Sequence, residues 1–371
     1  MLEGVLIMSR QKIKTHNAVF QPLIKVVKKS GELENEKLLD ENRYIKLTPS
    51  GEDCLKIAKV SEPYLVSPRV KAASISFQEN YYFIVAGLDN FSDNTFDLPV
   101  VGEANPLYAA LLEIAIYEFK IPLINSLQSL IIIDEIIHNY MGIDDYDGHD
   151  IDTVKQFFIP IELYEIESSY PLKAEQLIKL VGLRLCKQPN SLVLPFSTDT
   201  IELFWEVFSE GSSAIPYDNL VQCCYSVSWK HAFLELYLCV ERLYPIPVLN
   251  ELYTKMRFPN SFSLLDLVRN VEEILGWKAP EESSVKKILI DAITPQEAIT
   301  LLENVKKTSP QTSGTSIHKW FYSIRNNIVH FRLPTQQLDI SDISNENWDK
   351  IIRATLLIIE AWYKNYEQTL S

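Results

Sequence analysis

The apolar residues between positions 317 and 331 repeat at helical spacing, and this repeat predicts an amphipathic helix. At about 100° per residue, one side of that helix collects Ile317, Trp320, Phe321, Ile324, Ile328 and Phe331. The opposite side collects His318, Lys319, Tyr322, Arg325, Asn326, Val329 and His330. We therefore expect one face to be buried in a helical domain and the other face to carry groups that can do chemistry.

Arg325 and His330 are the residues of the polar face that most suggest a function. They are five positions apart, so on an ideal helix they project roughly 140° from each other. The two side chains would then flank a groove, with Asn326 and Val329 between them. Such a pair is suited to holding a ligand from two sides.

A second predicted helix, over residues 218–243, is apolar on two sides, which is typical of a helix at the centre of a bundle. Its Glu241 falls on or beside one apolar stripe. Because a buried carboxylate is costly unless it is paired, Glu241 should contact a cation, and Arg325 is the candidate. The alternative is that Glu241 only holds this helix to its neighbour through an ion pair. His231, near the same stripe, fits a core or interface histidine better than a catalytic one.

The motif from Arg325 to His330, an arginine followed by a polar residue, three further residues and a histidine, resembles the signature of the HEPN superfamily. These are small all-helical domains that are often ribonucleases. Residues 232–244 resemble the long HEPN helix with a glutamate near its end, here Glu241. Apolar and aromatic residues at helical spacing between Trp348 and Tyr366 fit a closing helix. The resemblance covers residues 216–371 and leaves residues 1–215 unexplained.

The resemblance implies a metal-independent endoribonuclease that needs no cofactor and cleaves RNA by attack of the 2′-hydroxyl group. His330 suits proton transfer because an unperturbed histidine pKa of about 6.5 lies near working pH. Arg325 suits the phosphate because its planar fork presents paired donors. Asn326 would orient the ribose or phosphate as a neutral donor. The candidate catalytic residues are therefore Arg325, Asn326, His330 and Glu241.

One histidine cannot readily act as both base and acid, and the resemblance implies a homodimer in which two such motifs share one cleft. The partner is then RNA, either tRNA or mRNA. Candidate substrate-binding residues on the same helix are Lys319, Tyr322, Arg332 and His318, each of which is more often a plain surface residue. Many bacterial HEPN ribonucleases are toxins or anti-phage defence effectors, which implies control by a regulatory partner or a phage-derived trigger.

Two alternatives stay open. Some HEPN domains are non-catalytic dimerisation or ligand-binding modules, so the chain is alternatively a regulatory interaction protein. The second alternative is metal-dependent hydrolysis through residues 144–152, with the sequence DDYDGHDID, whose carboxylates would suit a hard cation but lack the EF-hand ligand order. A solvated acidic loop is the preferred interpretation of that segment.

The pattern predicts an α+β fold in three regions. Residues 1–104 are expected to be β-rich, with strands over 18–27, 43–48, 72–77, 81–87 and 96–101, and to act as a sensor or regulatory region. Residues 105–215 are expected to be helical or mixed, and residues 216–371 to form the HEPN-like helical domain.

A net charge of −14 argues against a broad, sequence-indifferent nucleic-acid binder, which would usually be basic. It leaves room for a small basic groove. The five cysteines, which show no zinc-site spacing, are expected to be buried thiols: Cys54, Cys186, Cys223, Cys224 and Cys239. No segment has the pattern of a signal peptide or membrane span. We therefore expect a cytoplasmic protein with no membrane partner.

Overall fold

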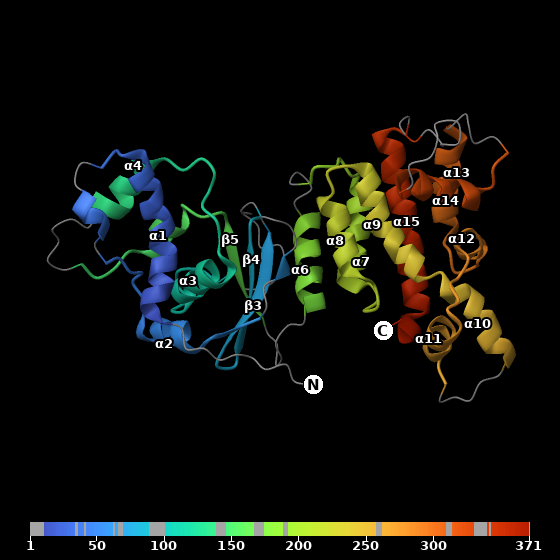
Figure 1. The fold of residues 1–371 in the computed structure, drawn as a ribbon, viewed down its shortest axis with the longest axis horizontal. Coiled ribbons are helices and arrows are strands. Elements are labelled where there is room, and N and C mark those ends of the chain that lie inside the picture. Colours follow the sequence, from blue (N-terminus) through green and yellow to red (C-terminus); the bar gives the residue numbers. More distant parts are fainter. Residues whose placement is uncertain are drawn as a thin grey trace. The chain divides into compact units, whose positions relative to one another are not determined.

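The computed structural model describes residues 11–33, 36–40, 42–61, 64–65, 70–88, 101–138, 146–166, 174–187, 192–256, 262–308, 314–329, 340 and 343–370. The chain forms two compact units, Met1–Ile178 and Lys179–Ser371 (Figure 1). His330 and Arg332, two residues that the sequence singles out, lie outside the described residues.

The first unit contains an antiparallel sheet in the order β1-β3-β4-β5, with β2 also paired to β3. Its strands are β1 (Lys59–Val60), β2 (Tyr64–Leu65), β3 (Lys71–Phe77), β4 (Asn80–Ala86) and β5 (Ile161–Ile166). β3 and β4 form a hairpin in which Phe77 is opposite Asn80. Gln78 has a φ of 56°, a left-handed conformation that a two-residue hairpin turn requires.

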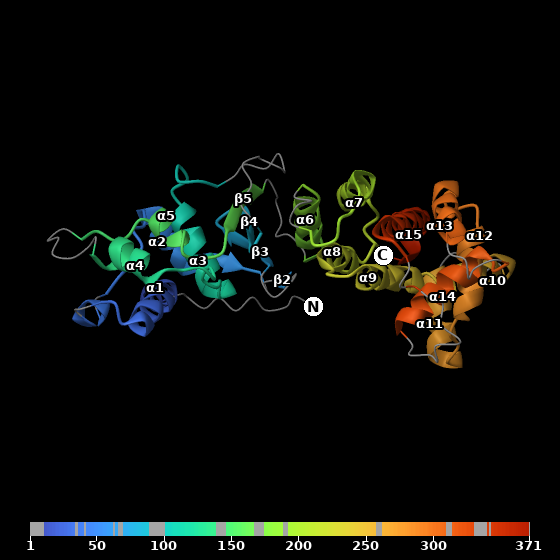
Figure 2. The same cartoon turned by 90° about the horizontal axis from the view of Figure 1, so that it is seen from above.

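Helices share a hydrophobic core with this sheet. They are α1 (Lys12–Ser30), α2 (Pro49–Ile57), α3 (Tyr108–Phe119), α4 (Ser129–Ile132) and α5 (Ile151–Lys155), together with the 3-10 turn η1 (Glu36–Asp40) and the π-helical segment η2 (Ile133–His138). In both views, α1 and α3 lie on the same side of the sheet (Figures 1 and 2). α3 is buried along most of its length and forms part of a core shared with α1 and the sheet.

The strand expected over residues 18–27 is wrong, because these residues belong to α1. Its β-branched and aromatic residues resemble a strand, but the buried set has helical spacing: Val19, Phe20, Leu23, Ile24 and Val27. Residues 43–48 form no strand either, and contribute only an isolated bridge between Ile45 and His149. The strands expected over 72–77 and 81–87 are confirmed as β3 and β4. The strand expected over 96–101 lies outside the described residues except for Val101.

The described residues of the second unit form helices only. After α6 (Ala174–Cys186) follow α7 (Thr198–Glu210), α8 (Tyr217–Tyr225), α9 (Trp229–Arg242), α10 (Pro245–Met256), α11 (Leu264–Leu275), α12 (Glu281–Ile290), α13 (Gln296–Thr308), α14 (Ile317–Val329), α15 (Asn345–Asn365) and α16 (Glu367–Leu370). α15 is the central helix, in contact with α7, α9 and α13. The closing helix expected around Trp348 to Tyr366 is thus confirmed.

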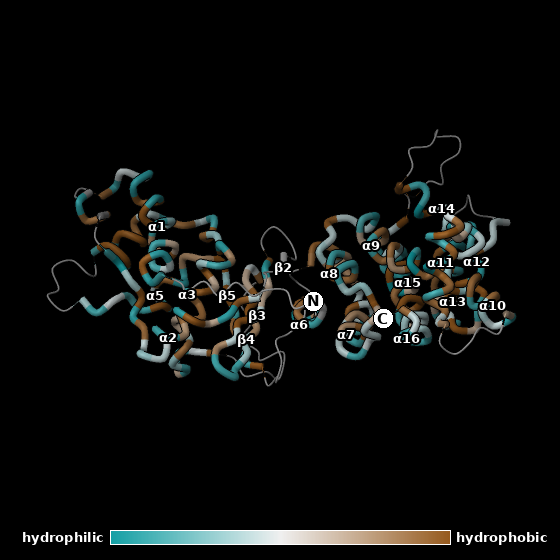
Figure 3. Tube along the Cα trace, turned by 60° about the horizontal axis from the view of Figure 1, so that its bottom comes forward, coloured by the Kyte–Doolittle hydropathy of each residue, from teal (hydrophilic) through white to brown (hydrophobic). Residues whose placement is uncertain are grey.

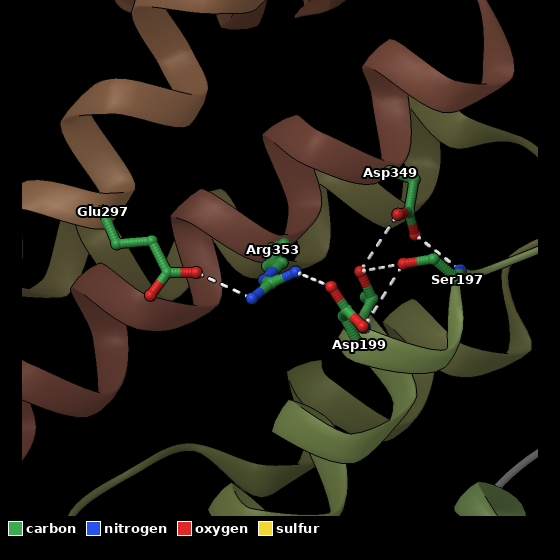
Figure 4. A network of polar contacts seen from close by, with 6 residues as sticks. Ser197, Asp199, Glu297, Asp349 and Arg353 are labelled. Atoms are coloured by element: carbon green, nitrogen blue, oxygen red, sulfur yellow. Dashed lines mark hydrogen bonds and ion pairs between the residues drawn. The ribbon is translucent and has the colours of Figure 1, made fainter.

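A polar network fastens α7 and α13 to α15 (Figure 4). The carboxylate of Asp349 accepts hydrogen bonds from the Ser197 backbone N–H at 3.0 Å and the Thr200 hydroxyl at 3.1 Å. One turn along α15, the guanidinium of Arg353 pairs with Asp199 and, at 2.7 Å, with Glu297. These contacts fix the start of α7 against the centre of the bundle.

The single helix expected over residues 218–243 is broken into α8 and α9. The break falls at Ser226–Ser228, where the Ser228 side chain accepts the His231 backbone N–H and caps α9. Val227, which lies in this break, is exposed. Leu238 is also half exposed, so the stripe is not continuous.

The α+β class is confirmed, with a small antiparallel sheet in the first unit and a helical second unit. Apolar and polar stretches alternate along the helices of both units (Figure 3). α7 packs on α15. The finer division at residues 104 and 215 stays a prediction.

Among the described residues, no helix has both the length and the apolar character to cross a membrane.

Candidate functional site

Helix α14 carries most of the residues that the sequence singles out. Its buried residues include Trp320, Phe321 and Ile324, as predicted from the apolar spacing. The ring of Phe321 meets that of Phe233 edge-on, with the centroids 5.5 Å apart. This packing fixes the rotation of α14 against α9 and turns Arg325 toward the end of α9.

Arg325 and Glu241 form the ion pair that the sequence predicted. The Nε atom of Arg325 donates to Oε1 of Glu241 at 2.8 Å, and Nη2 lies 2.7 Å from the same oxygen. The side chains are 15% and 26% exposed, so the pair is partly shielded from water. A charge in such a position has to be paired, which explains why the two helices meet here.

Asn326 lies deeper than expected. It was placed on the polar face, but it is 6% exposed, and its Oδ1 atom accepts a hydrogen bond from Nη1 of Arg325 at 3.0 Å. Its amide oxygen therefore points at the arginine, and in this arrangement Asn326 orients Arg325.

Glu281, the first residue of α12, also contacts this group, and the sequence interpretation missed it. Its Oε2 atom lies 3.5 Å from Nη1 of Arg325 and accepts a hydrogen bond from the Tyr322 hydroxyl at 2.8 Å. The sequence marks it only as an acid after Pro280 at a helix start. Nothing in its spacing from Arg325 indicates the contact, which arises because α12 packs on α14.

The surroundings shift the pKa values of three residues on α14. Burial lowers the pKa of Arg325, but the carboxylates of Glu241 and Glu281 outweigh it, and the net direction is upward. Burial raises the pKa of Tyr322, and Glu281 acts in the same direction. Burial and nearby lysines, Lys286 first, lower the pKa of His318. The guanidinium is therefore permanently charged, while His318 favours its neutral form.

The remaining candidates on α14 are Lys319 and His318, which contact residues other than Arg325 and Glu241. Lys319 is exposed, and its Nζ atom lies 4.0 Å from Glu282. His318 Nε2 lies 3.3 Å from the Ser316 hydroxyl. The structure thus brings Arg325, Asn326 and Glu241 together with Tyr322, and it leaves Lys319 and His318 at the surface nearby. His330, Phe331 and Arg332 lie outside the described residues.

Two exposed apolar residues adjoin the ion pair. Leu238 precedes Glu241 by one turn of α9, and Val329 follows Arg325 by one turn of α14. They are 50% and 46% exposed. Apolar side chains are therefore exposed on both helices within one turn of the ion pair.

The second unit also contains a polar groove. A groove of about 660 Å³ is lined by Asn250, Glu251, Lys255, Lys287 and Tyr366, among others. Both of its lysines pair with Glu251, so little free positive charge remains there. Within the described part of the chain, no three His, Cys, Asp or Glu side chains are grouped so that they could hold a metal ion.

The acidic segment at residues 144–152 is described from residue 146 onward. Asp147 pairs with Lys46, and the Asp152 carboxylate accepts a hydrogen bond from the Tyr108 hydroxyl at 3.1 Å. His149 is fully buried.

The five cysteines are free and buried, as expected.

Comparison with family models finds no match, and the same holds for comparisons with curated proteins and with solved structures. Any function assigned to this chain therefore rests on its own side chains.

Proposed function

We propose that this protein is a metal-independent endoribonuclease of HEPN type, with Arg325 as the phosphate-binding group and His330 as the proton-transfer group. The observation that supports the proposal most is the ion pair between Arg325 and Glu241. It holds a charged guanidinium at a partly exposed position on the helix whose next residue is His330. A charged, partly exposed guanidinium of this kind is suited to binding a phosphate.

The proposed reaction is an internal transfer at phosphorus. The ribose 2′-hydroxyl attacks the adjacent phosphate, its proton passes to a base, and the bond to the 5′-oxygen breaks as that oxygen receives a proton. The products are a 2′,3′-cyclic phosphate and a 5′-hydroxyl. Arg325 neutralises the charge that develops on the phosphorane-like transition state. Glu241 and Asn326 act as positioning residues because they fix the guanidinium and not the RNA.

We further propose that the protein acts as a homodimer, because one His330 cannot readily supply both the base and the acid. The exposed Leu238 and Val329 beside the ion pair support this proposal. A second copy that covers them would bring two Arg325–His330 motifs toward one cleft.

The biological role proposed here is that of a cytoplasmic toxin or anti-phage defence effector that cleaves tRNA or mRNA. The first compact unit would then act as the sensor, answering to a regulatory partner or a phage-derived trigger. This part rests on the resemblance to bacterial HEPN effectors. Expression in bacteria tests it: the wild-type protein should arrest growth and the His330→Ala variant should not.

A non-catalytic HEPN module is the second candidate, and one observation favours it. Each of the three guanidinium nitrogens of Arg325 already has a partner among Glu241, Glu281 and Asn326. A closed group of this kind also serves to join α9, α12 and α14. In that case Arg325 is structural and the protein binds a partner without cleaving it.

Cleavage of a mixed RNA pool in excess chelator separates the two candidates. The wild-type protein should cut RNA, while Arg325→Ala and His330→Ala should not. Arg242→Ala is the matched control, because Arg242 is the exposed neighbour of Glu241 on α9 and should not matter. Loss of cleavage in the control as well would count against a specific role for Arg325.

A further inference from the structure

Glu281 contacts Arg325 from a third helix and from the more open side. Glu241 and Asn326, the other two partners, are 26% and 6% exposed. The Glu281 side chain is 44% exposed. Glu281 is the first residue of α12 and follows Pro280, so its backbone is held in the helix. Its carboxylate lies beside the guanidinium of Arg325.

The positions of the three partners decide which part of Arg325 is open to a ligand. Glu241 occupies Nε and Nη2, and the amide oxygen of Asn326 accepts from Nη1. The carboxylate of Glu281 also lies at Nη1. A phosphate bound to an arginine takes two parallel N–H donors, and a carboxylate already at one edge both blocks a donor and repels the incoming negative charge.

We infer that Glu281 is a built-in competitor of the RNA phosphate for Arg325, and that it has to leave the guanidinium before RNA binds. This inference rests on the proposed function. Glu281 is thus a regulatory residue of the same site. The three partners of Arg325 are then compatible with a role in RNA binding as well as with a structural role. RNA displaces only Glu281, the most exposed of the three.

Several features allow Glu281 to leave. Its contact with Nη1, at 3.5 Å, is longer than the contacts of Glu241. Exposed ion pairs are weak because water screens them, and an exposed side chain changes rotamer rapidly. The hydrogen bond from Tyr322 at 2.8 Å is then the stronger of the two contacts that hold Glu281 in place.

Glu282 provides a matched control within the same helical turn. It has the same charge and a similar exposure, 51%. Its carboxylate lies 4.0 Å from Nζ of Lys319. Within the part of the chain that the structure describes, Glu282 forms no hydrogen bond or ion pair with Arg325. A general effect of removing one negative charge near RNA will therefore appear equally in Glu281→Gln and Glu282→Gln.

The first test measures binding of a short fluorescein-labelled single-stranded RNA to full-length protein in the His330→Ala background, so that cleavage does not interfere. Glu281→Gln retains the oxygen that accepts from Tyr322 but loses the charge. It should bind RNA about two- to fivefold more tightly, the range expected for one exposed ion pair. Glu282→Gln should show a smaller change. Equal gains in both variants, or no gain in Glu281→Gln, would overturn the inference.

The second test does not depend on RNA. An arginine-specific dicarbonyl reagent is applied to wild-type, Glu281→Gln and Glu282→Gln proteins, and modification of Arg325 is quantified by mass spectrometry relative to the exposed Arg242. Arg325 should become more reactive in Glu281→Gln only. Unchanged reactivity would overturn the competitor role whether or not the protein cleaves RNA. Increased reactivity in a protein that never binds RNA would instead overturn the proposed function while leaving the contact intact.

Discussion

The Nε atom of Arg325 donates to Oε1 of Glu241 at 2.8 Å, and this contact joins α14 to α9 across 84 residues of sequence. It connects the stability of the second unit to the orientation of the group proposed to bind phosphate. A change in either residue should therefore alter both the free energy of unfolding and RNA cleavage, and the two effects can be measured separately.

Replacement of Glu241 by glutamine should lower the free energy of unfolding by about 1–3 kcal/mol, because the partly shielded guanidinium of Arg325 loses its opposite charge although the oxygen that accepts from Nε remains. Urea unfolding at neutral pH measures the change. Glu251→Gln is the control, because water screens the exposed pair of Glu251 with Lys255 and its loss should lower stability much less. Equal losses in the two variants would show that Glu241 is not specially placed.

Replacement of Leu238 by aspartate should weaken self-association and reduce RNA cleavage together. Leu238 is half exposed within one chain, so the change should cost the monomer little stability. Sedimentation velocity across a range of concentrations measures the dimer fraction. Ile57→Asp, at an exposed apolar residue of the first unit, should leave the dimer intact. A Leu238→Asp protein that dimerises normally would argue against a dimer built on this surface.

Replacement of Asp349 by alanine should destabilise the protein by about 1–3 kcal/mol, because the partly buried N–H of Ser197 and the buried hydroxyl of Thr200 would lose their acceptor (Figure 4). Glu346→Ala, on the exposed side of the same helix, should change stability far less. Thermal unfolding compares the two. Similar melting temperatures would mean that the network does not fasten α7.

The stability of the protein should fall as pH drops from neutral, in part because of His149. Burial, helped by the charge of Arg43, lowers the pKa of this histidine from 6.5 to about 4. Between these two values the unfolded chain binds a proton that the folded chain does not, so the free energy of unfolding falls with falling pH. The contribution is at most about 1.4 kcal/mol per pH unit, and it levels off below the folded value.

His149→Phe removes this titration and keeps a ring beside Phe20 and Tyr146. Urea unfolding at several pH values between 4 and 7 should therefore give a shallower pH dependence for the variant than for the wild-type protein. Identical slopes would contradict the expected pKa shift.

Helical periodicity was enough to predict α14 and α15, since their apolar residues recur every three or four positions. The cost of burying a lone charge was enough to pair Glu241 with Arg325. The same rules failed for residues 18–27, where β-branched residues around Pro22 suggested a strand although Val19, Leu23 and Val27 line one side of a helix. These rules also missed the contact between Glu281 and Arg325. That contact depends on how α12 packs on α14, and the spacing of the two residues in the sequence does not indicate it.

The most direct test of the proposed function compares two RNAs that differ in one hydroxyl group. The cleavage position in a defined RNA is mapped first, and a second substrate carries a 2′-deoxyribose immediately 5′ to that position. In excess chelator, the wild-type protein should cut the first RNA to a 2′,3′-cyclic phosphate and leave the second uncut, and Arg325→Ala should cut neither. Cleavage of the deoxy substrate at that position, or undiminished cleavage by Arg325→Ala, would contradict 2′-hydroxyl attack at a site built around Arg325.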